Sequence, residues 1–94
     1  MAQVIWTENA RQDADDVAAY VASFSERQAE LLFQRFFERT DQLANFPEMG
    51  RIVPEIDKPS HRELLEGNYR IMYELLDDIV LIQRIIHQNR NFVP

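Results

Sequence analysis

Four polar side chains in the second half of the chain are of kinds that could catalyse the cleavage of a phosphodiester. They are Glu63, Arg70, Gln83 and His87. An arginine can stabilise the charge of a phosphorane, and a histidine with a pKa near neutrality can move the proton of a 2′-hydroxyl group. Together they would suit RNA cleavage by 2′-hydroxyl attack, provided that the fold brings them to one surface.

A structural explanation also accounts for these residues. Arg70 and Glu63 can form an ordinary cross-strand ion pair, and His87 can be a residue at the end of a strand. The pattern alone favours this explanation and leaves the catalytic one open. His61 has no metal-ligand partner at a suitable spacing, so we expect no metal site and no cofactor.

The region that must position these side chains runs from His61 to His87 and is typical of three strands joined by two tight turns. Gly67-Asn68 suits a two-residue hairpin turn, and Asp77-Asp78 offers a second one. Turns of this length fix how the strands are paired. We therefore expect Glu66 opposite Tyr69.

Side-chain alternation then assigns the strand residues to two faces. With Leu76 opposite Ile79, the apolar face, which helices should cover, collects Leu64, Ile71, Tyr73, Leu75, Val80, Ile82 and Ile86. The mixed face, which could meet a partner, collects His61, Glu63, Arg70, Met72, Glu74, Leu76, Ile79, Leu81, Gln83, Ile85 and His87. In this register Arg70 lies opposite Ile85 and one diagonal step from His87.

The first half of the chain predicts a strand followed by two helices. Residues 4–6 are β-branched and aromatic, and Thr7 can cap the helix that follows. Ser25 and Gln28 form a capping box that begins the second helix. Apolar residues recur at helical spacing in the first helix, at Ala14, Val17, Ala18, Val21 and Phe24, with Asp13, Asp15 and Asp16 outside. The apolar face of the second helix is Ala29, Leu32, Phe33, Phe36, Phe37, Thr40, Leu43 and Ala44.

The remaining segment, residues 46–60, contains three prolines and a glycine, so we expect a connecting loop without regular structure. The order strand, helix, helix, strand, strand, strand predicts an α+β, two-layer fold. In it a helical hairpin packs on a small, mostly antiparallel sheet, with the N-terminal strand at its side. The expected core is Val17, Val21, Phe33, Phe36, Leu43, Ile71, Tyr73 and Ile82.

Length and composition limit the possible functions. Ninety-four residues suffice for a single domain spanning residues 1–94. The absence of cysteine excludes disulfides and thiolate metal sites, and no apolar stretch approaches the roughly 20 residues that a membrane span needs, so we expect a cytoplasmic protein without membrane contact. A net charge of −6 opposes binding to a phosphate backbone, and we expect no direct DNA binding by the chain alone.

Several short segments, taken in their order and spacing along the chain, resemble those of a known protein family. They are Trp6-Thr7 before an alanine- and aspartate-rich helix, Leu43–Arg51, Val53–Glu55, Arg62–Leu64, Tyr69–Tyr73, and Ile86-His87 followed by Arg90. Nearly the whole chain resembles the RelE/ParE superfamily of bacterial toxins from type II toxin–antitoxin systems. The FPxxGR…VPE and REL…YRIxY pieces are most similar to its ParE-like branch. The resemblance implies the same α+β fold.

The resemblance implies two alternative activities. RelE-like members cleave mRNA in the ribosomal A site, whereas ParE-like members inhibit DNA gyrase and are not nucleases; an antitoxin neutralises both. The nuclease-branch arginine falls at Arg70, and the histidine of its YoeB-like subgroup falls at His87. The tyrosine after that histidine is replaced by Gln88, and the position of the general-base glutamate falls at Pro47. Lys58 is the only lysine.

From this resemblance we expect a ParE-like toxin that inhibits DNA gyrase, contributes to plasmid stabilisation and forms a hetero-oligomer with a cognate antitoxin. The alternatives are a RelE-like ribosome-dependent mRNA endoribonuclease, in which Arg70 and His87 would be catalytic, and a decayed, non-toxic module that only binds antitoxin. Residues expected to contact a protein partner are Glu63, Gln83 and Arg90.

Overall fold

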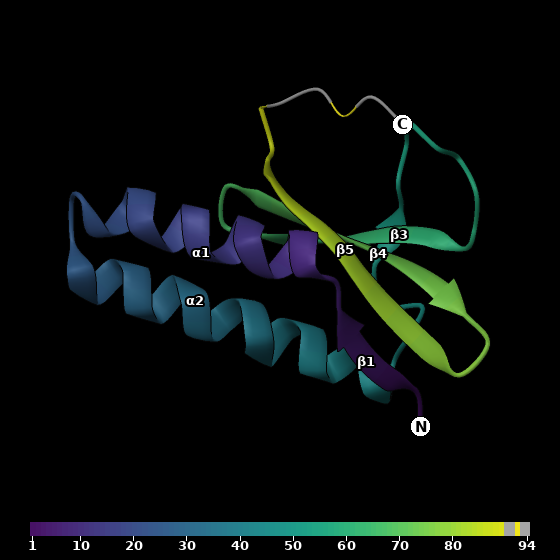
Figure 1. Cartoon of the computed structure of the whole chain (residues 1–94). Coiled ribbons are helices and arrows are strands. Elements are labelled where there is room, and N and C mark those ends of the chain that lie inside the picture. The colour runs from purple at the N-terminus through teal and green to yellow at the C-terminus, as the bar shows by residue number, and fades with distance from the viewer. Residues whose placement is uncertain (90–91, 93–94) are drawn as a thin grey trace.

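The computed structural model describes residues 1–89 and residue 92, and it confirms the predicted α+β fold. The two helices lie antiparallel to one another and pack on one face of a sheet (Figure 1). In chain order the elements are β1 (Gln3–Trp6), α1 (Glu8–Ala22), α2 (Glu26–Asp41), the 3-10 turn η1 (Gln42–Ala44), β2 (Arg51–Ile52), β3 (His61–Glu66), β4 (Tyr69–Leu76) and β5 (Ile79–His87).

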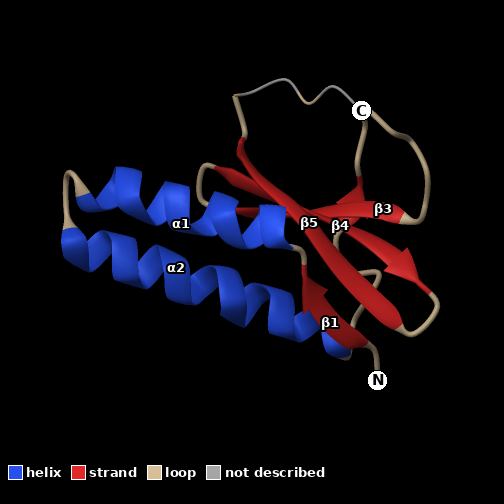
Figure 2. Cartoon of the chain, in the orientation of Figure 1, coloured by secondary structure: helices blue, strands red, loops and turns tan. Residues whose placement is uncertain are grey.

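The sheet has five strands in the order β1-β5-β4-β3-β2 (Figure 2). β1 is parallel to β5, as expected for an N-terminal strand added at the side, and the other pairs are antiparallel. The short strand β2 lies inside the segment predicted as a loop. Arg51 pairs with Glu63, and Ile52 pairs with Arg62. This two-residue ladder is therefore an addition to the predicted fold.

The helices begin where their capping residues predict. The Thr7 hydroxyl accepts a hydrogen bond from the Ala10 amide at 3.0 Å, and the Ser25 hydroxyl accepts one from the Gln28 amide at 3.2 Å. Each bond satisfies one of the free N–H groups in the first helical turn. None of the helices in residues 1–89 is long and apolar enough to cross a membrane.

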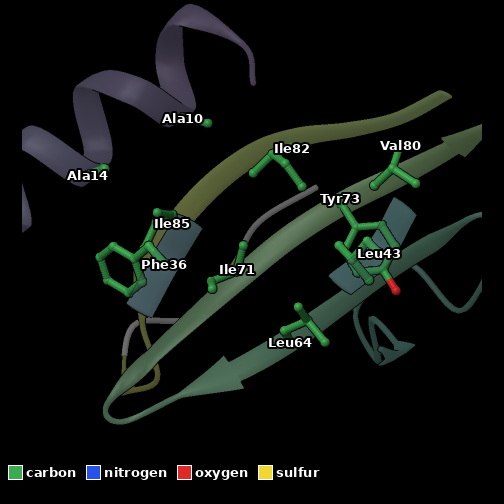
Figure 3. Close-up of a cluster of buried hydrophobic side chains, with 10 residues drawn as sticks. All are labelled: Ala10, Ala14, Phe36, Leu43, Leu64, Ile71, Tyr73, Val80, Ile82 and Ile85. Atoms are coloured by element: carbon green, nitrogen blue, oxygen red, sulfur yellow. The ribbon is translucent and has the colours of Figure 1, made fainter. Parts of the chain in front are cut away.

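The main core fills the space between the helices and the sheet (Figure 3). Its buried members are Ala10, Ala14, Phe36, Leu43, Leu64, Ile71, Tyr73, Val80, Ile82 and Ile85. Of the expected core residues, Val17, Val21 and Phe33 are only half-buried. Val17 and Phe33 only pack against the main core, whereas the small side chains of Ala10 and Ala14 let α1 approach β5 closely.

A bulge in β5 changes the predicted faces. Both turns have the expected register, with Glu66 opposite Tyr69 and Leu76 opposite Ile79. However, Met72 pairs with Arg84 while Tyr73 pairs with Ile82, so Gln83 is an extra residue on β5. Every β5 side chain after Gln83 therefore points to the face opposite from the one predicted.

Because of this reversal, the predicted faces of two apolar residues are wrong. Ile85 lies in the main core, and Ile86 lies on the other face of the sheet. There it forms a second apolar cluster with Val53 and Met72, against which Ile56 and Phe92 pack. Through this second cluster, the 46–60 segment packs across the face of the sheet that lacks helices.

Candidate functional site

The FPxxG piece fastens the 46–60 segment to the sheet. The buried Tyr73 hydroxyl donates to the Pro47 carbonyl at 2.8 Å and accepts from the Gly50 amide at 2.9 Å. A Cβ on Gly50 would lie 2.6 Å from the Glu63 carbonyl oxygen and 2.7 Å from the Tyr73 hydroxyl. Glycine is required here because the segment approaches the sheet so closely.

Beyond Gly50, two charged side chains of the segment, Arg51 and Glu55, lie on the face of the sheet without helices. There they contact the predicted pair Glu63 and Arg70. Arg51 Nε and a terminal Arg51 nitrogen both lie 2.6 Å from Glu63 Oε2. Arg70 Nε donates to Glu63 Oε1 at 2.7 Å, and the two terminal Arg70 nitrogens donate to the two Glu55 oxygens at 2.7 Å each. We call these four residues, Arg51, Glu55, Glu63 and Arg70, the charge network.

Burial makes this pairing obligatory. Glu63 is 1% exposed and Arg70 is 5% exposed, and a buried charge needs a partner of the opposite sign. The hydrogen bonds from Arg70 lower the pKa of Glu55 from 4.5 to about 2. Hydrogen bonds from Glu55 and Glu63 in turn raise the pKa of Arg70. The two carboxylates and two guanidinium groups balance, so the network presents no net charge.

The network confirms the cross-strand ion pair between Arg70 and Glu63. It also limits what Arg70 can bind, because its Nε and both terminal nitrogens already face carboxylate oxygens. A phosphate at Arg70 would have to displace the bidentate Glu55 carboxylate. Sequence reasoning did not group Arg51 and Glu55 with the pair, although both lie in the FPxxGR…VPE pieces.

The structure separates His87 from Arg70. Because of the bulge, Arg70 lies opposite Ile86 and His87 lies opposite Tyr69, so the expectation that Arg70 and His87 share a face is wrong. The His87 ring meets the edge of the Tyr69 ring at a centroid distance of 5.4 Å, on the helix side of the sheet. Its Nδ1 accepts a hydrogen bond from the Asn89 amide at 3.1 Å.

The remaining expected site residues lie apart from the charge network. Gln83 is half-buried and donates to Glu74 Oε1 at 3.0 Å. Glu74 is also 3.5 Å from Nε2 of His61. Within residues 1–89 and at residue 92, no three potential ligands are arranged to hold a metal ion. Arg90 lies outside the described residues.

A groove of about 830 Å³ opens between the outer half of the helical hairpin and the ends of β4 and β5. Its lining combines apolar and charged side chains, including Asp16, Val17, Tyr20, Val21, Leu32, Arg35, Tyr69, Ile85 and His87. Tyr20 is 63% exposed, although a tyrosine offers a large apolar surface. The groove is therefore a candidate protein-binding surface, which the sequence did not reveal because its two walls come from distant segments.

Asp13 is one of the residues that line this groove. It was expected on the outer face of α1, but its carboxylate accepts a hydrogen bond from the Ile85 backbone amide at 2.9 Å and another from Arg84 Nε at 2.7 Å. β1 pairs with β5 only as far as Ile82, so beyond that point the edge of β5 is contacted by α1 instead of β1. No local pattern marks Asp13 for this role.

Comparisons with known proteins agree with this geometry. The family model described as the ParE toxin of the type II toxin–antitoxin system parDE matches residues 4–92. Toxin RelE2 of Caulobacter vibrioides is 36% identical over 91 residues, which cover 96% of this chain and 99% of that protein.

Solved structures show the same fold. The chromosomal ParDE toxin–antitoxin system of P. aeruginosa contains a chain with a TM-score of 0.74 and 22% identity, over 93% of this chain and 96% of that one. The toxin–antitoxin complex RelBE2 of Mycobacterium tuberculosis contains one with a TM-score of 0.65 and 20% identity, over 92% and 96%. The match to the family model, together with the RelE2 relative, shows that this chain belongs to the RelE/ParE superfamily as a toxin of a type II toxin–antitoxin system.

Proposed function

We propose that this toxin inhibits DNA gyrase through a protein interface and cleaves no RNA. The observation that carries the proposal is the separation of Arg70 and His87 onto opposite faces of the sheet. General acid–base catalysis needs its groups within hydrogen-bonding reach of one substrate, either directly or through one water molecule. These two side chains cannot serve one phosphodiester in this arrangement.

Electrostatics support the same choice. The charge network is internally neutral, so Arg70 adds no free positive charge to its face. The chain carries a net charge of −6, whereas the ribosomal A site is a dense phosphate surface that repels acidic proteins at long range. Pro47 and Gln88 occupy the positions of the general base and of the stacking tyrosine in the nuclease branch. The ribonuclease alternative therefore lacks most of its chemistry.

We also propose that a cognate antitoxin binds the groove beside Tyr20 and Tyr69. The groove offers apolar side chains from α1, α2 and β5 beside two acidic and two basic side chains, and the chain as a whole carries a net charge of −6, so a complementary segment would carry apolar residues and a net positive charge. A disordered antitoxin segment that folds on binding can follow such a surface. β2 pairs with only two residues of β3, so Leu64–Glu66 could also accept an added strand.

The target is tested by assaying the purified toxin with gyrase, plasmid DNA and ATP, beside programmed ribosomes with mRNA. We expect inhibition of supercoiling, intact mRNA, and unchanged inhibition by His87→Ala. Ribosome-dependent cleavage of mRNA that His87→Ala or Arg70→Ala abolishes would overturn the proposal in favour of the nuclease. Activity in neither assay, with antitoxin binding preserved, would indicate the decayed module.

The antitoxin site is tested with Tyr20→Arg, which places a positive charge in the groove at an exposed position. We expect affinity for the antitoxin to fall by about tenfold or more, because a tyrosine anchor is lost and basic partner residues are repelled. Gln34→Arg is the matched control, since it adds the same charge at an exposed α2 position outside the groove. Equal affinities of the two variants would place the antitoxin elsewhere.

A further inference from the structure

A second hollow lies at the end of β4 away from the groove beside Tyr20 and Tyr69. It has a volume of about 840 Å³, and its lining is Phe46, Pro47, Glu48, Met49, Leu75 and Asp77; we call it the Phe46 hollow. Tyr69 begins β4, whereas Leu75 lies near its end. Figure 1 shows the β4–β5 turn, which contains Asp77, at the opposite end of the molecule from the α1–α2 turn. The groove and the Phe46 hollow are therefore separate surfaces.

The Phe46 hollow gathers exposed apolar side chains. Phe46 is 64% exposed and Met49 is 41% exposed. Leu75, which is half-buried and packs against the main core, adds a third apolar side chain to the same lining. Single exposed apolar residues are normal on a protein surface, whereas several that line one hollow indicate a binding surface. This arrangement favours a partner with an apolar side chain of its own.

Hydrogen bonds hold the turn that carries Phe46 and Met49 in place. The Phe46 amide donates to the Gln42 carbonyl at 3.0 Å, and the Met49 amide donates to the Phe46 carbonyl at 3.1 Å. The buried Tyr73 hydroxyl donates to the Pro47 carbonyl between them. Binding here costs little ordering of the backbone, which suits a folded partner with a surface of its own. A disordered antitoxin segment is better matched by the groove and the strand edge proposed for it above.

The charges that line the Phe46 hollow are negative. Glu48 and Asp77 are both exposed. Within residues 1–89 and at residue 92, no ion pair joins either carboxylate to a basic side chain. The guanidinium of Arg62 donates instead to the backbone carbonyls of Glu48 and Gly50, at 3.3 and 3.0 Å. The hollow therefore presents two carboxylates that a basic partner can pair.

We propose that the Phe46 hollow is the surface through which this toxin contacts gyrase, where it receives an apolar side chain from a basic surface of that enzyme. An enzyme that holds DNA carries basic side chains on its surface, because these meet the phosphates. Such residues would face the carboxylates of the hollow, and the net charge of −6 favours the encounter. The inference rests on the proposed function, since it assigns a surface to the same target.

Phe46→Ser tests the apolar contact, with Phe24→Ser as the matched control. Phe24 is also an exposed phenylalanine, at 75%, but it lies at the tip of the helical hairpin. With purified toxin, gyrase, plasmid DNA and ATP, we expect Phe46→Ser to need about tenfold more toxin for the same inhibition of supercoiling, as for loss of an aromatic anchor. Phe24→Ser should inhibit like the native protein. Phe46→Ser should keep the native antitoxin affinity and the native unfolding temperature.

A double variant, Glu48→Gln with Asp77→Asn, tests the charges. Asparagine tolerates the positive φ of 50° at Asp77, so the turn is kept. At low salt we expect affinity for immobilised gyrase to fall about threefold or more, with a shallower dependence on salt concentration than in the native protein. Asp15→Asn with Glu38→Gln is the control, since it removes two charges from exposed helix positions outside the hollow and should weaken binding less.

The outcomes separate this inference from the proposed function. Native-like inhibition of gyrase by Phe46→Ser would overturn the inference, while gyrase remained the target. Full inhibition together with weakened antitoxin binding would assign the hollow to the antitoxin instead. If Phe46→Ser unfolds at a lower temperature than Phe24→Ser, the double variant decides, and equal binding by that variant and its control would overturn the inference. A native protein that does not inhibit gyrase would overturn the proposed function and this inference together.

Discussion

The hydroxyl of Tyr73 accepts a hydrogen bond from the backbone amide of Gly50 at 2.9 Å, and this contact joins the 46–60 segment to the centre of the sheet. Because the hydroxyl also donates to the Pro47 carbonyl, both of its hydrogen-bonding functions are used in a buried position. The segment that carries Arg51 and Glu55 therefore has a fixed starting point. The ion pairs farther along it depend on this fastening.

Gly50→Ala should destabilise the protein. Its Cβ would lie 2.6 Å from the backbone oxygen of Glu63, which cannot move without disturbing the β2–β3 ladder. We expect a loss of about 1–3 kcal/mol in the free energy of unfolding, as for overpacking in a core. Urea denaturation measures this loss. Gly67→Asn is the control, since Gly67 has open space around it and asparagine tolerates its positive φ, so a similar loss in both variants would contradict the explanation.

Phe36→Ala should cost about 3–5 kcal/mol in the free energy of unfolding, because it leaves a cavity at the centre of the main core. Phe36 is fully buried and meets the edge of the Tyr69 ring at a centroid distance of 5.9 Å. Phe24→Ala is the matched control at an exposed position of the hairpin tip and should change stability by no more than about 0.5 kcal/mol. Thermal unfolding that fails to distinguish the two variants would refute the assigned helix face.

Substitutions at Asp13 should separate the contributions of the two partners of its carboxylate, the Ile85 amide and the Arg84 guanidinium. Asp13→Ala leaves the Ile85 amide without its acceptor and should cost about 1–3 kcal/mol. Asp13→Asn keeps an oxygen for that amide and loses only the ionic contact with the partly exposed Arg84, so it should cost about 0–1 kcal/mol. Chemical denaturation of both variants, beside Asp15→Ala as an exposed control, measures the difference. Equal losses would show that the ion pair dominates.

The pH dependence of stability should report on Glu55. Its pKa falls from 4.5 to about 2 in the folded protein, so folding favours the ionised carboxylate. The stability that this carboxylate adds is therefore complete above about pH 4.5 and is lost as the pH falls toward 2. An NMR titration of the Glu55 carboxyl carbon should give the lowered pKa directly. The stability difference between the native protein and Glu55→Gln should shrink below pH 4.5, and a constant difference would contradict the assignment.

The sequence by itself determined the two helices, four of the five strands and the two turn registers of this protein. Thr7, Ser25 and Gln28 are local signals, since a capping side chain bonds an amide two or three residues away. Gly67-Asn68 and Asp77-Asp78 act in the same local way and fix which residues face each other beside each turn. Short-range interactions of this kind can be recognised in the sequence because both partners are close together along the chain.

Only the tertiary structure decided the bulge at Gln83 and the composition of the site. Ile85 and Ile86 are both apolar, so alternation cannot tell which of them faces the helices, and either register satisfies the pattern. The choice depends on contacts from far along the chain, in which the Gln83 carbonyl accepts from Thr7 and the Ile85 amide donates to Asp13.

That choice sends His87 to the helix side and leaves Arg70 with Glu55 and Glu63. Whether Arg70 is free to bind a phosphate or is held by carboxylates is therefore decided by long-range packing, because Glu55 and Glu63 reach it from other segments of the chain.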